Sequence, residues 1–380
     1  MKKFTSIILF ALLIQVVSAQ KIDKKKFDFK EIKNLKTTSV KSQDRTGTCW
    51  CFATTSFLET ELIRMGKGEF DLSEMFFIRN AYKTKALSYV RFHGKTNFGQ
   101  GGQAHDVVNE IAENGIVPES VYSGKVYGQE KHNHSEQNAV LKGMLDGVIK
   151  SRKPTPVWNK AYCSVLDAYL GEVPASFTYE GKTYTPESFA ETLGINPDDY
   201  IELTSYSHHS PYYESFVLEM PDNWSYDGYY NLPVDDLIEV MKKAITAGYS
   251  VAWDGDMSDK GFSHKNGVAI VPEEDWENMS DEVKDSVFVK PGKEKQITQE
   301  MRQEAFANYT VTDDHLMHLT GMAKDKNGTY YFLTKNSWGP ESNDFGGYLY
   351  MSESFVRLHT MAFMIHKDAL PKNIKEKLGL

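Results

Sequence analysis

The sequence has few cysteines, no excess of positive charge and, beyond its N-terminal segment, no long apolar run. Three cysteines in 380 residues exclude a scaffold that depends on a framework of disulfides. Acidic residues outnumber basic ones by 52 to 43, so the composition favours neither a nucleic-acid partner nor binding to an anionic membrane surface. The chain is instead rich in apolar and aromatic residues, at 41% and 13%, which is enough to bury a substantial core.

The N-terminal segment has the pattern of a secretory signal peptide. A basic start at 1–3 precedes an apolar stretch at 4–17, and the small residues that follow suit cleavage after Ala19. The apolar stretch is shorter than the roughly twenty residues that a membrane-spanning helix needs. We therefore expect residues 1–19 to be removed and the mature chain to be exported, either to the periplasm or out of the cell. Stable insertion in a membrane is not expected.

An odd number of cysteines in an exported chain indicates at least one free thiol. Cys49 and Cys51 are two residues apart, and on a helix they would point about 200° away from each other, which argues against a disulfide between them. Apolar residues recur at helical spacing from Cys49 to Gly66, so we expect a helix that begins at or near Cys49. A helix N-terminus stabilises a thiolate, which makes Cys49 the candidate nucleophile. Cys51 and Cys163 are interpreted as packed side chains.

Acyl transfer by a thiolate also needs a histidine to exchange the proton and a third group to orient that histidine. Among eleven histidines, His315 opens an apolar run that predicts a buried strand. An Asn-Gly turn within 325–328 and a second strand at 330–335 would complete a hairpin. The hairpin would bring Asn336 beside His315, with Trp338 available to cover their hydrogen bond.

Other histidines are less suited to this role. His318 faces the opposite side of the same strand from His315, because side chains alternate along a strand. Asp313 and Asp314, which precede His315, either raise its pKa or simply form a turn, and the sequence leaves both interpretations open. No metal site is expected, because the remaining histidine pairs lack ligands at metal-binding spacing and are interpreted as solvated loop residues: His132, His134, His208 and His209.

Together these segments resemble the signature of papain-like cysteine peptidases. The stretches that carry the resemblance occur in the family's order: Gln43, the Thr-Gly-Thr-Cys-Trp run at 46–50, His315, and Asn-Ser-Trp-Gly at 336–339. The resemblance implies that Cys49 is the nucleophile, that His315 is the acid and base, and that Asn336 orients His315. It also implies that Gln43 and the backbone N–H of Cys49 stabilise the oxyanion. This chemistry requires no cofactor.

Two further stretches fit the same resemblance. Leu72-Ser73-Glu74 resembles the start of a helix in the family's helical lobe. Gly101-Gly102 resembles the glycine pair that binds the substrate backbone, where the lack of a side chain lets a peptide approach closely. Trp338 is expected to line the same site. The resemblance implies an α+β papain-like fold of two lobes, one helical and one β-barrel-like, with a peptide or protein substrate in the cleft between them.

The spacing of the motifs identifies the branch of the family that the chain resembles. Cys49 and His315 lie 266 residues apart, whereas about 130–150 residues separate the two in papain. The additional chain at about 123–231 predicts helices at 135–150 and 159–170 and a hairpin at 178–184. A large, mostly helical insertion and few disulfides resemble the bleomycin hydrolase and aminopeptidase C branch.

We therefore expect one catalytic domain at 20–380. Its helical lobe would cover about 40–122, its insertion about 123–231 and its strand-rich lobe about 232–370.

The sequence leaves specificity and assembly open. Members of that branch owe aminopeptidase action to a C-terminal arm, and the sequence ends at Leu380, about nine residues after Pro371. Both aminopeptidase and endopeptidase action are therefore compatible with the resemblance, as is a homo-oligomer. Two rival functions would use the same fold: a catalytically silent peptide-binding or scaffold protein, and a hydrolase of non-peptide amides. The intact set of catalytic positions favours the peptidase.

Overall fold

A hairpin of two apolar strands lies at the centre of the molecule. In the computed structural model, which describes residues 27–380, β10 (His315–Lys324) and β11 (Tyr330–Lys335) pair in antiparallel register. Nine of the ten residues of β10 are buried, because other elements cover both of its faces. This explains why the segment is a continuous apolar run rather than an alternating one. The predicted hairpin is confirmed.

The hairpin belongs to a sheet of eleven strands. The order is β5-β6-β4-β13-β7-β10-β11-β12-β9-β8, and β1 pairs with β10 beside this path. The pairs are antiparallel except β4 with β6 and β9 with β12. The other strands have these bounds: β1 (Lys30–Asn34), β4 (Tyr200–Thr204), β5 (Ser215–Val217), β6 (Gly228–Asn231), β7 (Val251–Gly255), β8 (Phe262–Ser263), β9 (Val268–Ala269), β12 (Tyr348–Ser352) and β13 (Thr360–His366).

One predicted boundary is wrong. The strands β4, β5 and β6 lie within 200–231, which we expected to belong to the insertion, yet they extend the main sheet through the pairing of β4 with β13. Each of these strands has only three to five residues. Only β4 contacts the rest of the sheet, and its partner β13 lies more than 150 residues further along the chain, so no local pattern could assign these strands to the sheet. The strand-rich half therefore includes 200–231.

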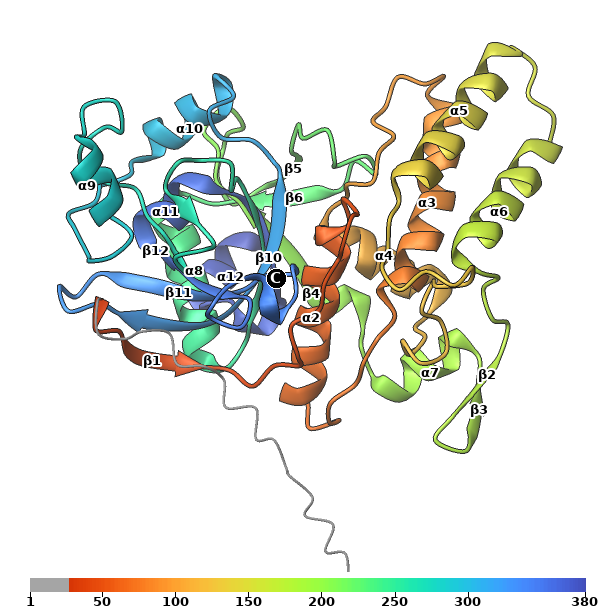
Figure 1. Ribbon diagram of the computed structural model, residues 1–380, viewed down its shortest axis with the longest axis horizontal. Coiled ribbons are helices and arrows are strands. Elements are labelled where there is room, and N and C mark those ends of the chain that lie inside the picture. Colours follow the sequence, from red (N-terminus) through yellow and green to blue (C-terminus); the bar gives the residue numbers. More distant parts are fainter. Residues whose placement is uncertain (1–26) are drawn as a thin grey trace, which may run out of the picture.

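The helical half is built around one buried helix. Figure 1 shows α2 (Cys49–Arg64) between the sheet and a group of helices formed by α3, α5 and α6. The elements of this half have these bounds: α3 (Glu74–Arg91), α4 (Ala104–Asn114), α5 (Ser135–Lys150), α6 (Val157–Leu170), α7 (Pro186–Leu193), and the small hairpin of β2 (Phe177–Tyr179) and β3 (Lys182–Tyr184). The helices and the hairpin predicted within 135–184 are confirmed. Ser73 caps α3 by accepting a hydrogen bond from Phe76, as the motif there suggested.

The sheet is covered by further helices. The longest is α8, whose apolar face packs into the core of the strand-rich half. These elements have the following bounds: α8 (Val234–Ala247), α9 (Asp281–Ser286), α10 (Gln299–Ala307), α11 (Glu353–His359), α12 (Lys372–Leu378), and the short turns η1 (Pro197–Asp199), η2 (Pro340–Ser342) and η3 (Lys367–Ala369). None of the helices within 27–380 combines the length and apolar character that crossing a membrane requires.

The two halves meet along α2. Ala252, Leu316 and Met364 from the strands belong to the same apolar core as the residues of α2. Phe57 of α2 also contacts the ring of Tyr200 on β4 edge-to-face, at 5.6 Å between centroids. Burial of α2 from both sides fixes its position, and with it the position of its first residue, Cys49.

Candidate active site

Cys49 is the first residue of α2, as the sequence predicted. The side chain is buried, with 9% of its surface exposed, and its sulfur accepts a hydrogen bond from the backbone N–H of Leu316 on β10. The backbone N–H groups of Cys51 and Phe52 donate to the carbonyl of Thr48, whereas within 27–380 those of Cys49 and Trp50 have no partner and are available to a ligand. The thiol therefore lies where the helical half faces the start of β10.

Gln43 is held beside this thiol by the segment that follows Asn336. The backbone N–H of Gln43 donates to the carbonyl of Ser337 at 2.9 Å, and its Oε1 accepts from the Ser337 hydroxyl at 2.6 Å. Its Nε2 donates to the carbonyl of Thr46 at 2.7 Å. An amide nitrogen carries two hydrogens, so one remains for a ligand. The orientation of Gln43 is thus fixed with a free donor.

His315 and Asn336 form the pair that the hairpin was expected to create. Nε2 of His315 lies 2.8 Å from Oδ1 of Asn336. Because an amide oxygen only accepts, Nε2 carries the proton and Nδ1 is left to exchange a proton with a thiol. The ring of Trp338 lies 5.1 Å from that of His315 and covers the pair, as predicted.

Six of the seven predicted site residues line a single cleft of about 490 Å³. They are Gln43, Cys49, Gly101, Gly102, His315 and Trp338. The seventh, Asn336, is buried behind His315. Side chains from residues 43 to 338 thus converge on one place, because α2 and β10 are packed against each other.

The pKa of the Cys49 thiol is shifted in the direction opposite to the one expected from a helix N-terminus. Burial raises the pKa of Cys49 to about 12, and the hydrogen bond from Leu316 only partly opposes this. The negative charges of Asp313, Asp254 and Asp222 act in the same direction as burial. The predicted place of Cys49 at a helix N-terminus is confirmed, and burial there opposes the thiolate that a helix N-terminus favours.

Burial also acts on the imidazole of His315. Burial lowers its pKa to about 4, against the raising effect of the hydrogen bond to Asn336, and the nearby His264 lowers it further. The sequence left open whether Asp313 and Asp314 raise the pKa of His315 or form a turn. Neither carboxylate contributes to the shift in the pKa of His315. Burial therefore acts against charge on both the thiol and the imidazole.

The glycine pair is constrained by protein contacts as well as by space for a ligand. A Cβ on Gly101 would lie 1.8 Å from Oδ2 of Asp222, and one on Gly102 would lie 2.7 Å from Oδ2 of Asp106. The carbonyl of Gly101 accepts a hydrogen bond from Lys85. Within 27–380, neither the N–H nor the C=O of Gly102 has a hydrogen-bond partner. Gly102 therefore offers its main-chain groups to the cleft.

Several residues of the site had not been predicted. Asp222 lines the cleft from the segment between β5 and β6, and His264 packs against Trp338 at 4.8 Å. Asp254 lies beneath the cleft on β7. An aspartate inside the apolar run of a buried strand was the one available signal for Asp254. The sequence offers no such signal for Asp222, because Asp222 reaches the cleft through its contact with Gly101, which is distant in the sequence.

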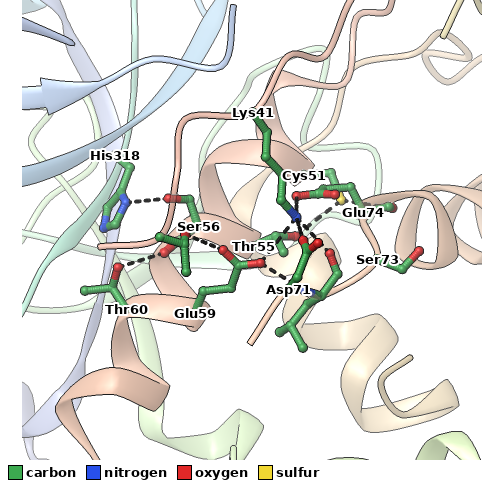
Figure 2. Close-up of polar contacts among 12 residues, drawn as sticks. Lys41, Cys51, Thr55, Ser56, Glu59, Thr60, Asp71, Ser73, Glu74 and His318 are labelled. Atoms are coloured by element: carbon green, nitrogen blue, oxygen red, sulfur yellow. Dashed lines mark hydrogen bonds and ion pairs between the residues drawn. The ribbon is translucent and has the colours of Figure 1, made fainter. Parts of the chain in front are cut away.

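A polar cluster with two buried carboxylates lies beside α2 (Figure 2). The Lys41 cluster consists of Lys41, Glu59, Asp71 and Glu74, with the three carboxylates arranged around the ammonium. Beside it, Ser56 of α2 bonds to Nδ1 of His318 at 2.9 Å and accepts from Lys335 at 2.7 Å. His318 thus ties α2 to the sheet and does not line the cleft. Because β11 ends at Lys335, next to Asn336, these contacts join the helix of Cys49 to the strand that positions Asn336.

Some interpretations of single residues were wrong. His132 and His134 are buried, not solvated, and the pKa values of both are lowered by burial, to about 4 and about 3. Cys51 is fully buried as predicted, whereas Cys163 is only half-buried. All three cysteines are free thiols.

His208 and His209 do have a carboxylate nearby, although the sequence spacing gave no sign of it. Glu219 lies 3.2 Å from one imidazole and 2.9 Å from the other. This is the only group of three potential metal ligands found within the described residues. The three side chains already pair with one another at the surface, and exposed pairs of this kind contribute little to stability.

Comparison with known proteins assigns the family. A profile of the peptidase C1-like family matches residues 175–379, more than half of the chain. The chain belongs to this family. A profile of the papain family cysteine proteases matches residues 24–165 of this C1-like peptidase. The protein is a cysteine-type peptidase with a papain-like α+β fold.

Individual relatives extend over most of the C1-like peptidase. Aminopeptidase G from Lactobacillus delbrueckii subsp. lactis is 24% identical over 399 aligned residues, which cover 91% of this chain and 84% of that protein. Aminopeptidase C from Lactobacillus helveticus is 24% identical over 386 residues, covering 88% and 80%. The crystal structure of PepW from Lactobacillus rhamnosis HN001 superposes with a TM-score of 0.69, at 22% identity, and covers 92% of this chain and 84% of that one. These similarities extend over 88–92% of this chain.

Proposed function

We propose that this cysteine peptidase acts on peptides with a free N-terminus, using Cys49 as nucleophile. The observation that carries the proposal is the convergence of Cys49, His315 and the unpaired main chain of Gly102 in one cleft. The pairing of His315 with Asn336 supports the same assignment, because it leaves Nδ1 available as the base. The similarity to proteins named aminopeptidase G and aminopeptidase C supports action on N-termini.

The reaction would begin at the thiol of Cys49. Since the pKa of the thiol is about 12 and that of the imidazole about 4, the proton would leave Cys49 for Nδ1 of His315 as the sulfur attacks the peptide carbonyl. The negative charge that forms on the carbonyl oxygen would be stabilised by Gln43 Nε2 and the Cys49 backbone N–H. Asn336 keeps the imidazole ring oriented during the transfer.

His315 would then return the proton to the leaving amine, and the acyl group would remain on Cys49 as a thioester. A water molecule, deprotonated by His315, would attack the thioester and release the new C-terminus. The proton returns to the thiol at the end. Every step uses groups of this chain and water, so the reaction needs no cofactor.

The preference for a free N-terminus can be tested with matched fluorogenic peptides. We expect N-acetylation of a peptide substrate to lower kcat/KM by at least about 100-fold, because binding energy from the substrate amine would be lost. The measurement compares the same peptide with free and acetylated N-termini, at several lengths. Equal rates on both would contradict the aminopeptidase assignment and indicate an endopeptidase.

We also propose that the enzyme is exported. The supporting pattern is the predicted signal peptide at 1–19, which lies outside the described residues. N-terminal sequencing of the protein from its native host should give a chain that begins at Gln20. A chain retained in the cytoplasm with Met1 intact would contradict this proposal. The homo-oligomer suggested by the resemblance stays a prediction.

A further inference from the structure

We propose that His208, His209 and Glu219 form a binding site for a divalent transition-metal ion, and that Zn²⁺ is the ion it takes. None of the three is among the described residues that line the cleft of Cys49, so the site is separate from the catalytic residues. The role of the ion would be structural, because it would join the loop after β4 to the chain that follows β5. The inference does not rest on the proposed function, since no step of peptide hydrolysis uses these side chains.

The first observation is the spacing of the three potential ligands. One ligand atom of each side chain lies within 4.8 Å of the other two. Oε2 of Glu219 is 3.2 Å from Nε2 of His208, and Oε1 of Glu219 is 2.9 Å from Nε2 of His209. Two ligands that each lie about 2.0–2.1 Å from a tetrahedral zinc ion are roughly 3.3 Å apart. Both separations are therefore close to those of ligands around a single ion.

A second, independent observation is that each ring nitrogen of His208 faces a hydrogen-bond acceptor. Nδ1 lies 3.1 Å from Oε1 of Gln303, and Nε2 lies 3.2 Å from Oε2 of Glu219. The Gln303 atom must be the amide oxygen, because it also accepts from the backbone N–H groups of Ser207 at 2.7 Å and His208 at 3.1 Å. A neutral imidazole carries one proton, so it can donate to only one of the two acceptors.

A metal ion would remove this conflict at His208. With the proton on Nδ1, the imidazole donates to Gln303, and the lone pair of Nε2 is free to bind the ion. The carboxylate of Glu219 would then bind the same ion instead of facing a lone pair. A second hydrogen-bond partner on the far nitrogen is typical of histidines that bind metals, because it fixes the tautomer and orients the ring. Gln303 is placed to act in this way.

Both imidazole rings are held in position before any ion binds. His208 stacks on Phe306 of α10 at 5.2 Å between ring centroids, and His209 stacks on Phe216 of β5 at 4.0 Å. The backbone is fixed by the fully buried Asn231, whose Nδ2 donates to the carbonyl of His209 at 2.7 Å. Ligands that are already ordered lose little conformational freedom on binding, which favours affinity.

The donor set selects the class of ion. Two imidazoles and one carboxylate suit Zn²⁺ and its neighbours Cu²⁺ and Ni²⁺, whereas Ca²⁺ and Mg²⁺ prefer sites made of oxygen ligands. The side chains of His208 and His209 are 30% and 34% exposed, so an ion can enter from the solvent. Three protein ligands leave a fourth position for water.

The test is a titration of the tag-free mature enzyme with ZnCl₂, followed by calorimetry. A cysteine thiolate can also bind zinc, so the wild type is compared with a double variant, His208→Phe with His209→Phe. Phenylalanine preserves the aromatic stacking and removes the ligand atoms. We expect the wild type to bind about one more Zn²⁺ per chain than the double variant. Saturating ZnCl₂ should also raise the Tm of the wild type by about 2 °C or more, because an ion that binds only the folded chain stabilises it.

Single variants assign the binding to the ligands and to their support. Glu219→Gln should weaken Zn²⁺ binding by about 30-fold or more, since the charged ligand is lost. Gln303→Met keeps all three ligands but removes the acceptor for Nδ1, and it should weaken binding about tenfold. His93→Asn is the matched control: it removes an exposed histidine just after α3 and should leave Zn²⁺ binding unchanged. Cooperative unfolding of each variant in EDTA shows that it is folded.

The position of the ion can be measured directly in crystals grown with ZnCl₂. An anomalous difference peak at the zinc edge, about 2.0–2.2 Å from Nε2 of both histidines and from the Glu219 carboxylate, would support the site. A peak at Cys49 alone would overturn the inference. Equal Zn²⁺ binding by the wild type and the double variant would also overturn it, and would indicate that a second proton on His208 satisfies the two acceptors. None of these measurements depends on turnover, so they are distinct from a failure of the peptidase assignment.

Discussion

Replacement of Cys49 by alanine is expected to lower kcat/KM on any peptide substrate by at least about 10⁴-fold. The reason is that the thioester cannot form without the sulfur, and no other nucleophile of the described residues lies in front of the first turn of α2 with His315 beside it. Substrate binding should persist, because Gln43, Gly101 and Gly102 are untouched. The measurement is steady-state turnover, together with binding of the substrate by the inactive variant.

Cys51 provides the matched control. It is two residues further along the same helix, but its side chain is fully buried and its thiol donates to the backbone carbonyl of Glu74 at 3.3 Å. Cys51→Ala should therefore cost some stability and leave turnover within about threefold of the wild type. Loss of activity in Cys51→Ala with retention in Cys49→Ala would reverse the assignment. Activity that survives both replacements would show that the chemistry does not depend on a cysteine.

Replacement of Lys41 by methionine is expected to lower the free energy of unfolding by about 3–5 kcal/mol. Lys41 is the only cation of the Lys41 cluster, and its Nζ pairs with three carboxylates: Asp71 at 2.6 Å, Glu74 at 2.8 Å and Glu59 at 3.3 Å. The side chains of Glu59 and Glu74 are only 1% and 4% exposed. Without Lys41, two buried carboxylates would lose their counter-charge, and this loss exceeds the gain from an apolar side chain.

The loss should depend on pH in a defined direction. Burial raises the pKa of Glu74 to about 7 even with Lys41 present, and removal of Lys41 would raise it further. A carboxyl group with a raised pKa in the folded state binds protons more tightly there than in the unfolded chain. Its effect on stability is therefore lost as pH rises from about 4.5 through the folded pKa. The deficit of Lys41→Met should be larger at pH 8 than at pH 5.

Lys36→Met is the matched control for this prediction. Lys36 pairs with Glu69 at 2.6 Å, but both side chains are more than half exposed, so its loss should change stability by less than about 0.5 kcal/mol. Urea denaturation followed by fluorescence measures both variants. A loss below about 1 kcal/mol in Lys41→Met would show that the two buried carboxyl groups do not depend on Lys41 as a counter-charge. A triple variant that adds Glu59→Gln and Glu74→Gln should recover part of the stability.

The sequence predicted those parts of the site that depend on local chain geometry. Cys49 begins a helix because loop residues precede it and apolar residues follow at helical spacing, and the structure confirms this. His315 and Asn336 meet because an Asn-Gly turn joins β10 and β11, whose antiparallel pairing runs from Lys324 with Tyr330 back to His318 with Lys335. In both cases the spacing along the chain and the direction of successive side chains are sufficient to place the groups.

Predictions that required distant partners failed or could not be made. The strands within 200–231 join the main sheet only through β13, and the burial of His134 depends on packing against α3, where its Nδ1 lies 3.3 Å from the hydroxyl of Tyr82. The low pKa expected for Cys49 was argued from its helix alone. The carboxylates that oppose it come from other parts of the chain.

The three cysteines show most directly which properties follow from the sequence and which from the tertiary structure. By itself, the sequence determined that Cys49 is the reactive candidate, because helix position and neighbouring motifs are properties of a continuous segment. Only the tertiary structure decided the environment of that thiol: burial by two packed halves, an N–H from Leu316, and the charges of Asp222, Asp254 and Asp313. Electrostatic energy depends on distance through space and on exclusion of water, and neither quantity is encoded in the spacing of residues along the chain.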